Sequence, residues 1–388
     1  MIEKYRHERI EDLALKLPPT DESRFILRQV EGWQKMRVKV PSWAAIDDLH
    51  YPPRLSLEQC SSESTAEYKA SLVGSPKLFI DLTAGFGVDF SFMAKKAEKA
   101  VYVERQEVLC ELARHNFPLL DLKHAEILNA TTEDVLGNLP ENPDETVIFL
   151  DPARRDEAGK KTVLLEDCTP NLVELWDELS RKATKIIVKL SPMLDVHAAL
   201  KRLDGVTEVH FVAHQGEMKE ILLVKDQDCD KETVCVCEEP PCHFTFNYEE
   251  ERSLSLPVLQ KSAVSSEYFL YEPCRSIMKA GAFKSLAHRF GLEALHPNSH
   301  LFVSAERLEN FPGRAFEILA QTTMNKGELK KFLKSRPKQA NIAVRNFPLT
   351  VAELRKRLKI KDGGEEYWFA TTLFDEKHVI LATKKQAF

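Results

Sequence analysis

The stretch FIDLTAGFGVDF places two glycines and two acids at the end of an apolar, strand-like run. Gly85 and Gly87 predict a turn that exposes backbone N–H groups and the start of a helix, an arrangement that often holds nucleotide-like ligands. Asp81 and Asp89 flank the turn, and acids attract a ligand with cationic groups more than one with a pyrophosphate. The stretch therefore predicts a cofactor site, with a purely structural turn as the alternative.

Phe90 separates this turn from the dinucleotide-binding pattern G-x-G-x-x-G, in which the third glycine allows helix and strand to pack closely. A phenylalanine at that position opposes such packing. The sequence therefore disfavours an NAD-dependent redox enzyme.

Two further segments suit the adenosine part of a cofactor. Glu104 ends the apolar run AVYVE, and an acid at this place can accept both ribose hydroxyls. Asn129 and Ala130 end the segment HAEILNA, where a loop can wall an adenine ring. The alternative for Glu104 is an ordinary solvated glutamate.

The segment VIFLDPARRD provides candidates for the reaction itself. Asp151 and Pro152 follow an apolar run that ends at the same sheet edge, where ligands bind in open α/β folds. Asp151 can accept a hydrogen bond from an acceptor N–H group and take up charge as that group reacts. Arg154 and Arg155 can bind phosphate beside this site, with a solvated surface loop as the alternative.

The strand-like segment KIIVKLSP adds two candidates for contact with a substrate. Lys189 ends an apolar strand, and a lysine there is seldom buried without a partner. We therefore expect Lys189 to face the site or to pair with an acid. Ser191 follows at the same edge and is expected to line the pocket for the substrate.

These residues need a sheet that brings the ends of several strands together. Short apolar runs alternate with helical stretches from about residue 76 to 225, which predicts a parallel sheet with helices on each side. The last two runs, in TEVHFVAHQGEMKEILLVK, are joined by a short polar turn and predict a terminal antiparallel hairpin. The predicted fold class is α/β: a helical N-terminal extension (1–70), a Rossmann-like sheet (71–226) and small α+β domains (227–314 and 315–388).

The charge of the 388-residue chain is unevenly distributed. The net charge is −6, but the tail from Asn325 onward has 15 Lys and Arg against 7 Asp and Glu, a charge of +8 that leaves −14 on the rest. A basic domain on an acidic body predicts an anionic partner for the tail. A solvated, lysine-rich helix face is the alternative.

The eight cysteines form no recognised metal-binding pattern. Cys229, Cys235, Cys237 and Cys242 lack the C-x2-C pairs of zinc sites, and the middle two share one face of a strand that can be core. We expect no metal and no disulfide framework. The sequence has no apolar run of membrane-spanning length and no apolar secretory signal, so we expect a cytoplasmic protein.

Together, DLTAGFGVD, VYVE, DPARRD and the closing hairpin resemble a class I S-adenosylmethionine-dependent methyltransferase. The preceding ESTAEYKA is similar to the opening of trimethylguanosine-synthase-like RNA methyltransferases. The stretches YEPCRSIMKAG, VRNFPLTVAELRKRLKIKDGG and FATTL resemble a bacterial methyltransferase family with a small ferredoxin-like segment and a THUMP-like domain. The resemblance covers most of the chain.

This resemblance implies S-adenosylmethionine as cofactor and methylation of a base in structured RNA, such as tRNA or rRNA, as the reaction. The basic THUMP-like tail would bind the RNA, and Asp151 with Pro152 would face the methyl acceptor. The residues that would bind the cofactor are Asp81, Thr83, Gly85, Gly87, Glu104, Asn129 and Ala130.

Two departures from the family pattern narrow the chemistry. Asp-Pro-Ala-Arg replaces the Asp/Asn-Pro-Pro-aromatic motif of base amino-methyltransferases, and the missing aromatic argues against methylation of an adenine or guanine amino group. The Asp151 loop has no cysteine nucleophile, which disfavours methylation of a pyrimidine carbon. The alternatives are a methyltransferase for protein or small molecules and a non-catalytic RNA-binding protein of this fold.

Overall fold

A computed structural model describes residues 2–141, 145–154, 165–166, 168–227, 229 and 232–386. The chain forms two compact units, one of Met1–Val209 with Lys219–Lys231 and one of His210–Met218 with Glu232–Phe388. The predicted boundaries at 70, 226 and 314 stay predictions.

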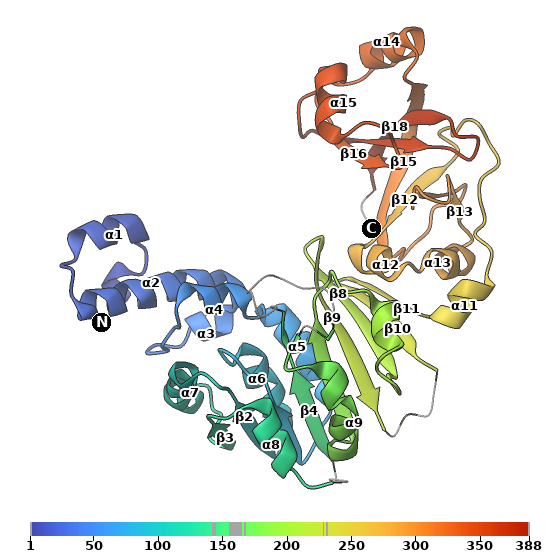
Figure 1. Ribbon diagram of the computed structural model, residues 1–388. Helices are drawn as coiled ribbons and strands as arrows, with labels where there is room; N and C mark the ends of the chain where they lie inside the picture. The colour runs from blue at the N-terminus through green and yellow to red at the C-terminus, as the bar shows by residue number, and fades with distance from the viewer. Residues whose placement is uncertain are drawn as a thin grey trace. The chain divides into compact units, whose positions relative to one another are not determined.

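A nine-stranded sheet with the order β11-β10-β8-β9-β7-β4-β1-β2-β3 positions the candidate site (Figure 1). Five neighbouring strands run parallel, as the sequence predicted, because each returns through a helical connection. They are β1 (Leu78–Asp81), β2 (Lys99–Val103), β3 (Ala125–Leu128), β4 (Thr146–Leu150) and β7 (Lys185–Leu190).

The predicted hairpin follows these parallel strands. Strand β9 (Glu217–Asp226) pairs antiparallel with β7, and β8 (Glu208–His214) precedes it. Gln215 and Gly216 join β8 and β9 with φ values of 52° and 77°, the left-handed backbone that tight hairpin turns favour. The strand order and this hairpin confirm the predicted Rossmann-like fold class. Strands β10 (Val234–Glu239) and β11 (Cys242–Asn247) continue the sheet.

Helices connect the parallel strands where the sequence changes from apolar runs to helical periodicity. Thr131 and Asn171 accept hydrogen bonds from backbone N–H groups in the first turns of α8 and α9, so their side chains fix the starts of these helices. The connecting elements are α6 (Val88–Met93), η2 (Ala94–Lys96), α7 (Glu107–Leu119), α8 (Thr132–Asn138), β5 (Ala153–Arg154), β6 (Cys168–Thr169), α9 (Leu172–Lys182) and α10 (Val196–Leu200).

The N-terminal extension is helical, as predicted, and packs on the sheet through its last helix. Thr20 and Ser62 cap the two longest helices of this segment. Ala66, Ala70 and Val73 of α5 belong to the same apolar core as Phe79 of β1. The elements are η1 (Glu3–Tyr5), α1 (Ile10–Lys16), α2 (Asp21–Lys39), α3 (Pro41–Ala44), α4 (Arg54–Gln59) and α5 (Glu63–Val73).

Phe90 takes the place of the third glycine without disturbing the turn. Its ring is fully buried and packs against the rings of Phe79, Tyr102 and Phe117, with centroid distances of 5.9, 5.4 and 5.1 Å. The helix after the turn therefore rests on an aromatic cluster, which explains why the dinucleotide pattern stops at Gly87.

The second unit has a seven-stranded sheet with the order β13-β14-β12-β15-β18-β17-β16. Its strands are β12 (Phe269–Pro273), β13 (Glu293–Ala294), β14 (Phe302–Ser304), β15 (Gly313–Thr323), β16 (Asn341–Arg345), β17 (Glu366–Thr372) and β18 (His378–Lys385). Its helices are α11 (Tyr248–Ser253), α12 (Arg275–Ala280), α13 (Phe283–Phe290), α14 (Lys326–Ser335) and α15 (Val351–Leu358).

Strand β15 was not expected from the sequence, which predicted a domain boundary after residue 314, inside this strand. The strand begins at Gly313, where an added Cβ would lie 2.2 Å from the carbonyl oxygen of Glu272, so the close approach requires glycine. One edge of β15 pairs with β12 and the other with β18. The two predicted C-terminal parts therefore share one sheet.

Cys235 and Cys237 are fully buried on β10, in the core position that the sequence allowed. The described residues contain no group of three or more His, Cys, Asp or Glu that could hold a metal ion. Within the same residues, every helix is too short or too polar to span a bilayer.

Candidate active site

The glycine turn after β1 is held by its own backbone and by an aromatic wall. The Thr83 N–H donates to Oδ1 of Asp81 over 3.0 Å, and the Tyr102 hydroxyl donates to the carbonyl oxygen of Gly85. Gly85 and Gly87 have φ values of 56° and 86°, and a Cβ on Gly87 would lie 3.3 Å from the Phe117 ring. Both positions therefore favour glycine.

Glu104 ties the turn after β1 to the turn after β2. Its side chain is nearly buried, Oε2 accepts from the Gly85 N–H over 3.0 Å, and Oε1 accepts from the Gln106 N–H over 2.8 Å. Asn129, after β3, donates from Nδ2 to the Glu104 carbonyl oxygen over 2.9 Å, and Ala130 follows it. The ends of three neighbouring strands thus bring these predicted cofactor residues together.

Asp81 has an unused acceptor at the centre of this arrangement. It is 1% exposed, and its Oδ2 has no hydrogen-bond partner among the described residues. Burial raises the pKa of Asp81 well above its usual value, and the Thr83 N–H opposes this only in part. An orphaned, buried carboxylate oxygen fits a ligand that brings a cationic or N–H group, so the residues present suit a sulfonium cofactor with an amino group.

Asp151 stands at the end of β4 beside the glycine turn. Its backbone N–H donates to Oγ1 of Thr83 over 2.6 Å, and its side chain is 40% exposed. Because Leu150 pairs with Val188 across the parallel strands, the next residues, Asp151 and Lys189, lie side by side. Lys189 Nζ donates to Oδ2 of Asp151. The lysine thus pairs with an acid, which is one of the two arrangements that the sequence predicted.

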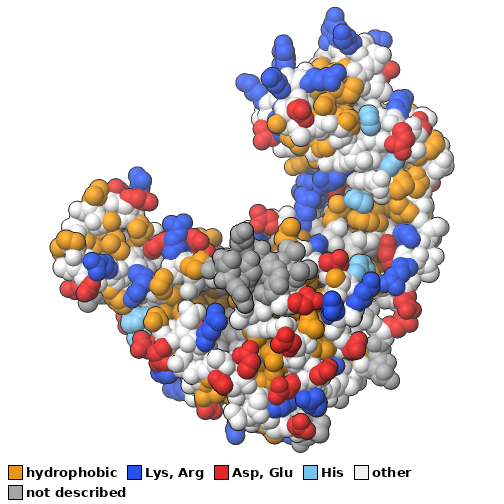
Figure 2. All heavy atoms as spheres, in the orientation of Figure 1, with side chains coloured by type: hydrophobic (Ala, Val, Ile, Leu, Met, Phe, Trp, Pro, Cys, Tyr) orange, Lys and Arg blue, Asp and Glu red, His pale blue; other side chains and the backbone are white. Residues whose placement is uncertain are grey.

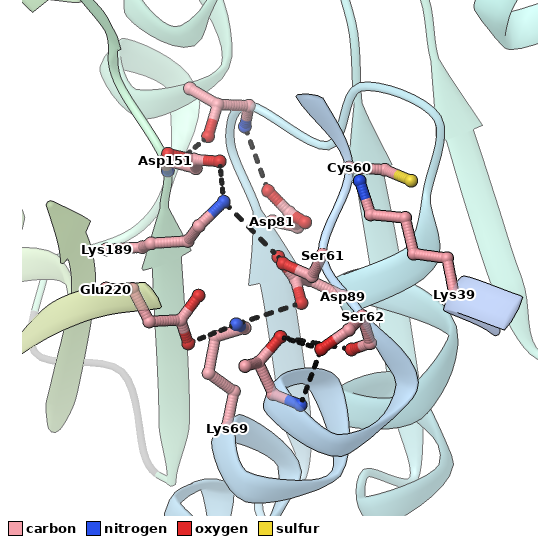
Figure 3. Close-up of polar contacts among 12 residues, drawn as sticks. Lys39, Cys60, Ser61, Ser62, Lys69, Asp81, Asp89, Asp151, Lys189 and Glu220 are labelled. Carbon is pink, nitrogen blue, oxygen red and sulfur yellow. Dashed lines mark hydrogen bonds and ion pairs between the residues drawn. The ribbon is translucent and has the colours of Figure 1, made fainter. Parts of the chain in front are cut away.

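Lys189 also approaches a second carboxylate. Its Nζ lies 3.9 Å from Oδ2 of Asp89, so the ammonium sits between Asp89 and Asp151 (Figure 3). Burial alone would lower the pKa of Lys189, but the two carboxylates outweigh it and raise that pKa above its usual value. The lysine is therefore charged at neutral pH.

The chain of charges continues to the helical extension. Lys69, on α5, lies with Nζ 3.2 Å from Oδ1 of Asp89 and also donates to Glu220 of β9. The Ser61 hydroxyl donates to Oδ2 of Asp89 over 2.7 Å. We call Asp151, Lys189, Asp89, Lys69 and Glu220 the charge network, which Figure 3 shows together.

Burial and pairing act in opposite directions on the acids of the charge network. Burial would raise the pKa of Asp89, but Lys69 and Lys189 outweigh it and lower that pKa. Burial raises the pKa of Glu220, and Lys69 opposes this only in part. The lysines thus keep Asp89 ionised, whereas burial shifts Glu220 toward its protonated form.

The sequence did not predict Lys69, Ser61 or Glu220 as part of the site. A signal for Lys69 was present, because it shares the small-residue face of ESTAEYKASLV, a face that the structure buries. Glu220 directly precedes the apolar run ILLV. A charged residue on an otherwise apolar face indicates a buried ion pair, but the sequence does not show which residue is the partner.

The remaining predicted residues lie near this edge or outside the described residues. Pro152 is buried after Asp151, and the buried Ser191 accepts a hydrogen bond at Oγ from the Met193 N–H over 3.2 Å. The backbone of Arg154 pairs with β6. The side chain of Arg154 and the whole of Arg155 lie outside the described residues.

Two family models match the C-terminal part of the chain. A ferredoxin-like domain matches residues 269–312, and a THUMP domain-like model matches residues 313–385. These matches confirm the ferredoxin-like and THUMP-like assignments made from the sequence. The search of curated proteins found no match.

A solved structure decides the family. The "putative methyltransferase from Porphyromonas gingivalis W83" is 35% identical to this chain, with a TM-score of 0.87 over 100% of this chain and 96% of that one. The chain belongs to the family of this protein. The helical extension, the parallel sheet and the C-terminal sheet are thus all part of the fold that this chain shares with that protein.

Two other solved structures are similar to a smaller share of the chain. An rRNA methylase from Streptococcus thermophilus is 16% identical, with a TM-score of 0.31 over 42% of this chain and 92% of that one. A tRNA (m1A58) methyltransferase from Aquifex aeolicus is 13% identical, with a TM-score of 0.32 over 43% and 69%.

Proposed function

We propose that this protein is an S-adenosylmethionine-dependent methyltransferase that acts on a base in structured RNA, such as tRNA or rRNA. The observation that carries the proposal is a single sheet edge with two kinds of residue side by side. Asp81, Gly85 and Glu104 form a cradle with an orphaned acceptor, and Asp151 with its lysine stands next to it. The family of the chain supports methyl transfer as the reaction.

The residues of this edge divide the work between holding the cofactor and receiving the acceptor. Asp81 and the turn through Gly85 and Gly87 would hold the methionine part, Glu104 the ribose, and Asn129 with Ala130 the adenine. S-adenosylmethionine supplies an electrophilic methyl group on a sulfonium. Transfer is an in-line displacement, so the chain must mainly align the acceptor and exclude water.

Asp151 is the group that orients the acceptor. Its carboxylate is partly exposed and can accept a hydrogen bond from an N–H of the acceptor. Lys189 occupies one carboxylate oxygen and the Thr83 hydroxyl accepts from the Asp151 N–H, so both ends of the residue are fixed. Because the Asp151 carboxylate is fixed, its hydrogen bond to the methyl acceptor sets the direction from which the acceptor's nucleophilic atom approaches the methyl group.

The C-terminal unit supports RNA as the substrate. Its THUMP-like part presents Lys and Arg side chains over α14 and α15, at the top of Figure 2. The exposed cations on these helices include Lys326, Lys330, Lys331, Lys334, Lys356 and Arg357. Such a surface binds the phosphate backbone without reading sequence, and specificity then comes from the acceptor site.

The deciding experiment uses S-adenosylmethionine labelled on its methyl group. The purified protein is incubated with total RNA from a strain that lacks the gene, and with protein and DNA from that strain as parallel acceptors. We expect label in RNA alone, lost in an Asp151→Ala variant that still binds S-adenosylhomocysteine in calorimetry. Label in protein or DNA instead, or no label with cofactor binding intact, would contradict the RNA assignment.

A further inference from the structure

The buried lysine of the helical extension is the feature that calls for a function. The Lys69 side chain is 0% exposed, although a lysine is almost never fully buried unless it is paired. Replacing a buried ion pair by apolar residues is often neutral or stabilising, so attachment of α5 to the sheet does not by itself explain this charge. The position of the charge relative to the active site offers an explanation.

Asp89 connects Lys69 to the acceptor side of the site. One oxygen of Asp89 lies 3.2 Å from Nζ of Lys69, and the other lies 3.9 Å from Nζ of Lys189. Lys189 in turn donates to Asp151. Charges therefore alternate in sign from α5 to the residue that orients the acceptor (Figure 3).

Lys189 is shared by two carboxylates, and Lys69 decides how it is shared. With Lys69 in place, Asp89 has a nearer cation and draws only weakly on Lys189. Without Lys69, the nearly buried Asp89 would keep Lys189 as its main cation, and attraction between unit charges rises steeply in a low-dielectric site. Lys189 would then move from Asp151 toward Asp89.

We propose that Lys69 is a positioning residue for methyl transfer, which acts through Asp89 to keep Lys189 on Asp151. The inference rests on the proposed function, and it makes helix α5 of the extension part of the reaction machinery. Because the ion pairs of Lys69 among the described residues go to Asp89 and Glu220, its loss affects alignment of the acceptor more than affinity for the cofactor. Misplacement of a reacting group by about 1 Å can cost about 100-fold in rate.

The test compares Lys69→Met with Lys182→Met. Lys182 is the matched control because it too is buried, at 6% exposure, but it donates to the carbonyl oxygens of Leu136 and Gly137 and pairs with Glu178 on its own helix. Methyl transfer is measured at saturating cofactor, together with the KM for cofactor and the thermal midpoint. We expect both variants to lower the midpoint, but only Lys69→Met to lower kcat, by about 10- to 100-fold, with KM within about threefold.

A second pair of variants tests the route through Asp89. If Lys69 acts through Asp89, then Lys69→Met added to Asp89→Asn lowers kcat by less than about twofold beyond Asp89→Asn alone. If Lys69→Met does not fold, Ser61→Ala removes the 2.7 Å hydrogen bond to Asp89 and is expected to lower kcat in the same direction by a few fold.

The outcomes separate this inference from the proposed function. If Lys69→Met and Ser61→Ala change kcat no more than Lys182→Met does, the positioning role of Lys69 is wrong while methyl transfer stands. Full additivity of Lys69→Met and Asp89→Asn would also overturn it. If the unaltered protein transfers no methyl group to any acceptor, the proposed function fails, and the inference fails with it.

Discussion

The two halves of the sheet edge are held in different ways. In the cofactor half, Gly85 and Thr83 donate backbone N–H groups to Glu104 and Asp81, over 3.0 Å in each case. In the acceptor half, the side chain of Asp151 depends on Lys189, and beyond it on Asp89 of α6 and Lys69 of α5. Each carboxylate of the cofactor half is thus held by backbone N–H groups, whereas the Asp151 carboxylate of the acceptor half is held by a charged side chain that other carboxylates also attract.

The cofactor half should therefore tolerate single substitutions better than the acceptor half. The cofactor half should lose affinity gradually as its hydrogen bonds are removed, because each contact is local. The acceptor half should lose rate sharply and cooperatively, because side chains that share partners are not additive.

The largest effect should come from Asp151→Asn, which keeps the shape of the side chain but removes its charge. We expect the rate of methyl transfer to fall by at least about 100-fold, because a positioned acid–base group contributes about 100- to 10,000-fold. Binding of S-adenosylhomocysteine, measured by calorimetry, should stay within about threefold. Asp177→Asn, an exposed acid on α9, is the control; an equal loss of rate there would remove the special role of Asp151.

A Glu104→Ala variant should show the opposite pattern. Loss of the carboxylate frees the N–H groups of Gly85 and Gln106, and we expect cofactor affinity to fall by about 10- to 100-fold with a smaller change in kcat at saturation. Glu107→Gln changes an exposed acid that pairs with Arg114 and should leave affinity unaltered. A fall in kcat without a fall in affinity would break the division into two halves.

Asp81→Asn should reveal a conflict between binding and stability. Burial raises the folded-state pKa of Asp81 above its unfolded value of about 3.9, so its contribution to stability is full below that value and is lost as pH rises through the folded pKa. Without cofactor, the thermal midpoint of the variant should therefore gain on that of the unaltered protein from pH 5 to pH 8. Cofactor affinity should fall by about 10-fold. A constant difference in midpoint across this range would contradict the assignment.

The smallest effect per residue should come from the basic helix of the second unit. Replacing Lys330, Lys331 and Lys334 by Gln should weaken RNA binding and reduce the slope of log affinity against log salt by about 2 to 3, since each phosphate contact contributes about 0.9. Cofactor affinity should not change. The control replaces Lys95, Lys96 and Lys99 of the first unit by Gln. If both variants change the salt dependence of RNA affinity equally, the RNA does not bind specifically to the basic helix α14.

The cofactor half was readable from the sequence because its parts are close together along the chain. Asp81, Gly85 and Gly87 lie in one turn, and Glu104 ends the next strand, so strand ends and residue types sufficed to place them. The structure brings them together as expected, although their roles in binding stay predictions. The same local reasoning found the parallel strands and the closing hairpin.

The charge network was not readable in this way. Lys69 and Glu220 are 151 residues apart, and only the packing of α5 against the sheet brings them to Asp89. Lys189 was the exception, because a lysine at the end of a buried strand indicates a nearby acid even when the acid is unknown. Strand β15 was missed for another reason: it begins at Gly313, next to the predicted domain boundary after residue 314.

The shared strand β15 has a consequence for how this family can be rearranged. The two family models meet between residues 312 and 313, where β15 begins. Strand β15 pairs on one edge with β12 of the ferredoxin-like part and on the other edge with β18 of the THUMP-like part. A hybrid protein that exchanged one part alone would expose an unpaired strand edge, which invites association between chains. We therefore expect the ferredoxin-like and THUMP-like parts to be exchanged between proteins as one unit and to unfold in a single transition.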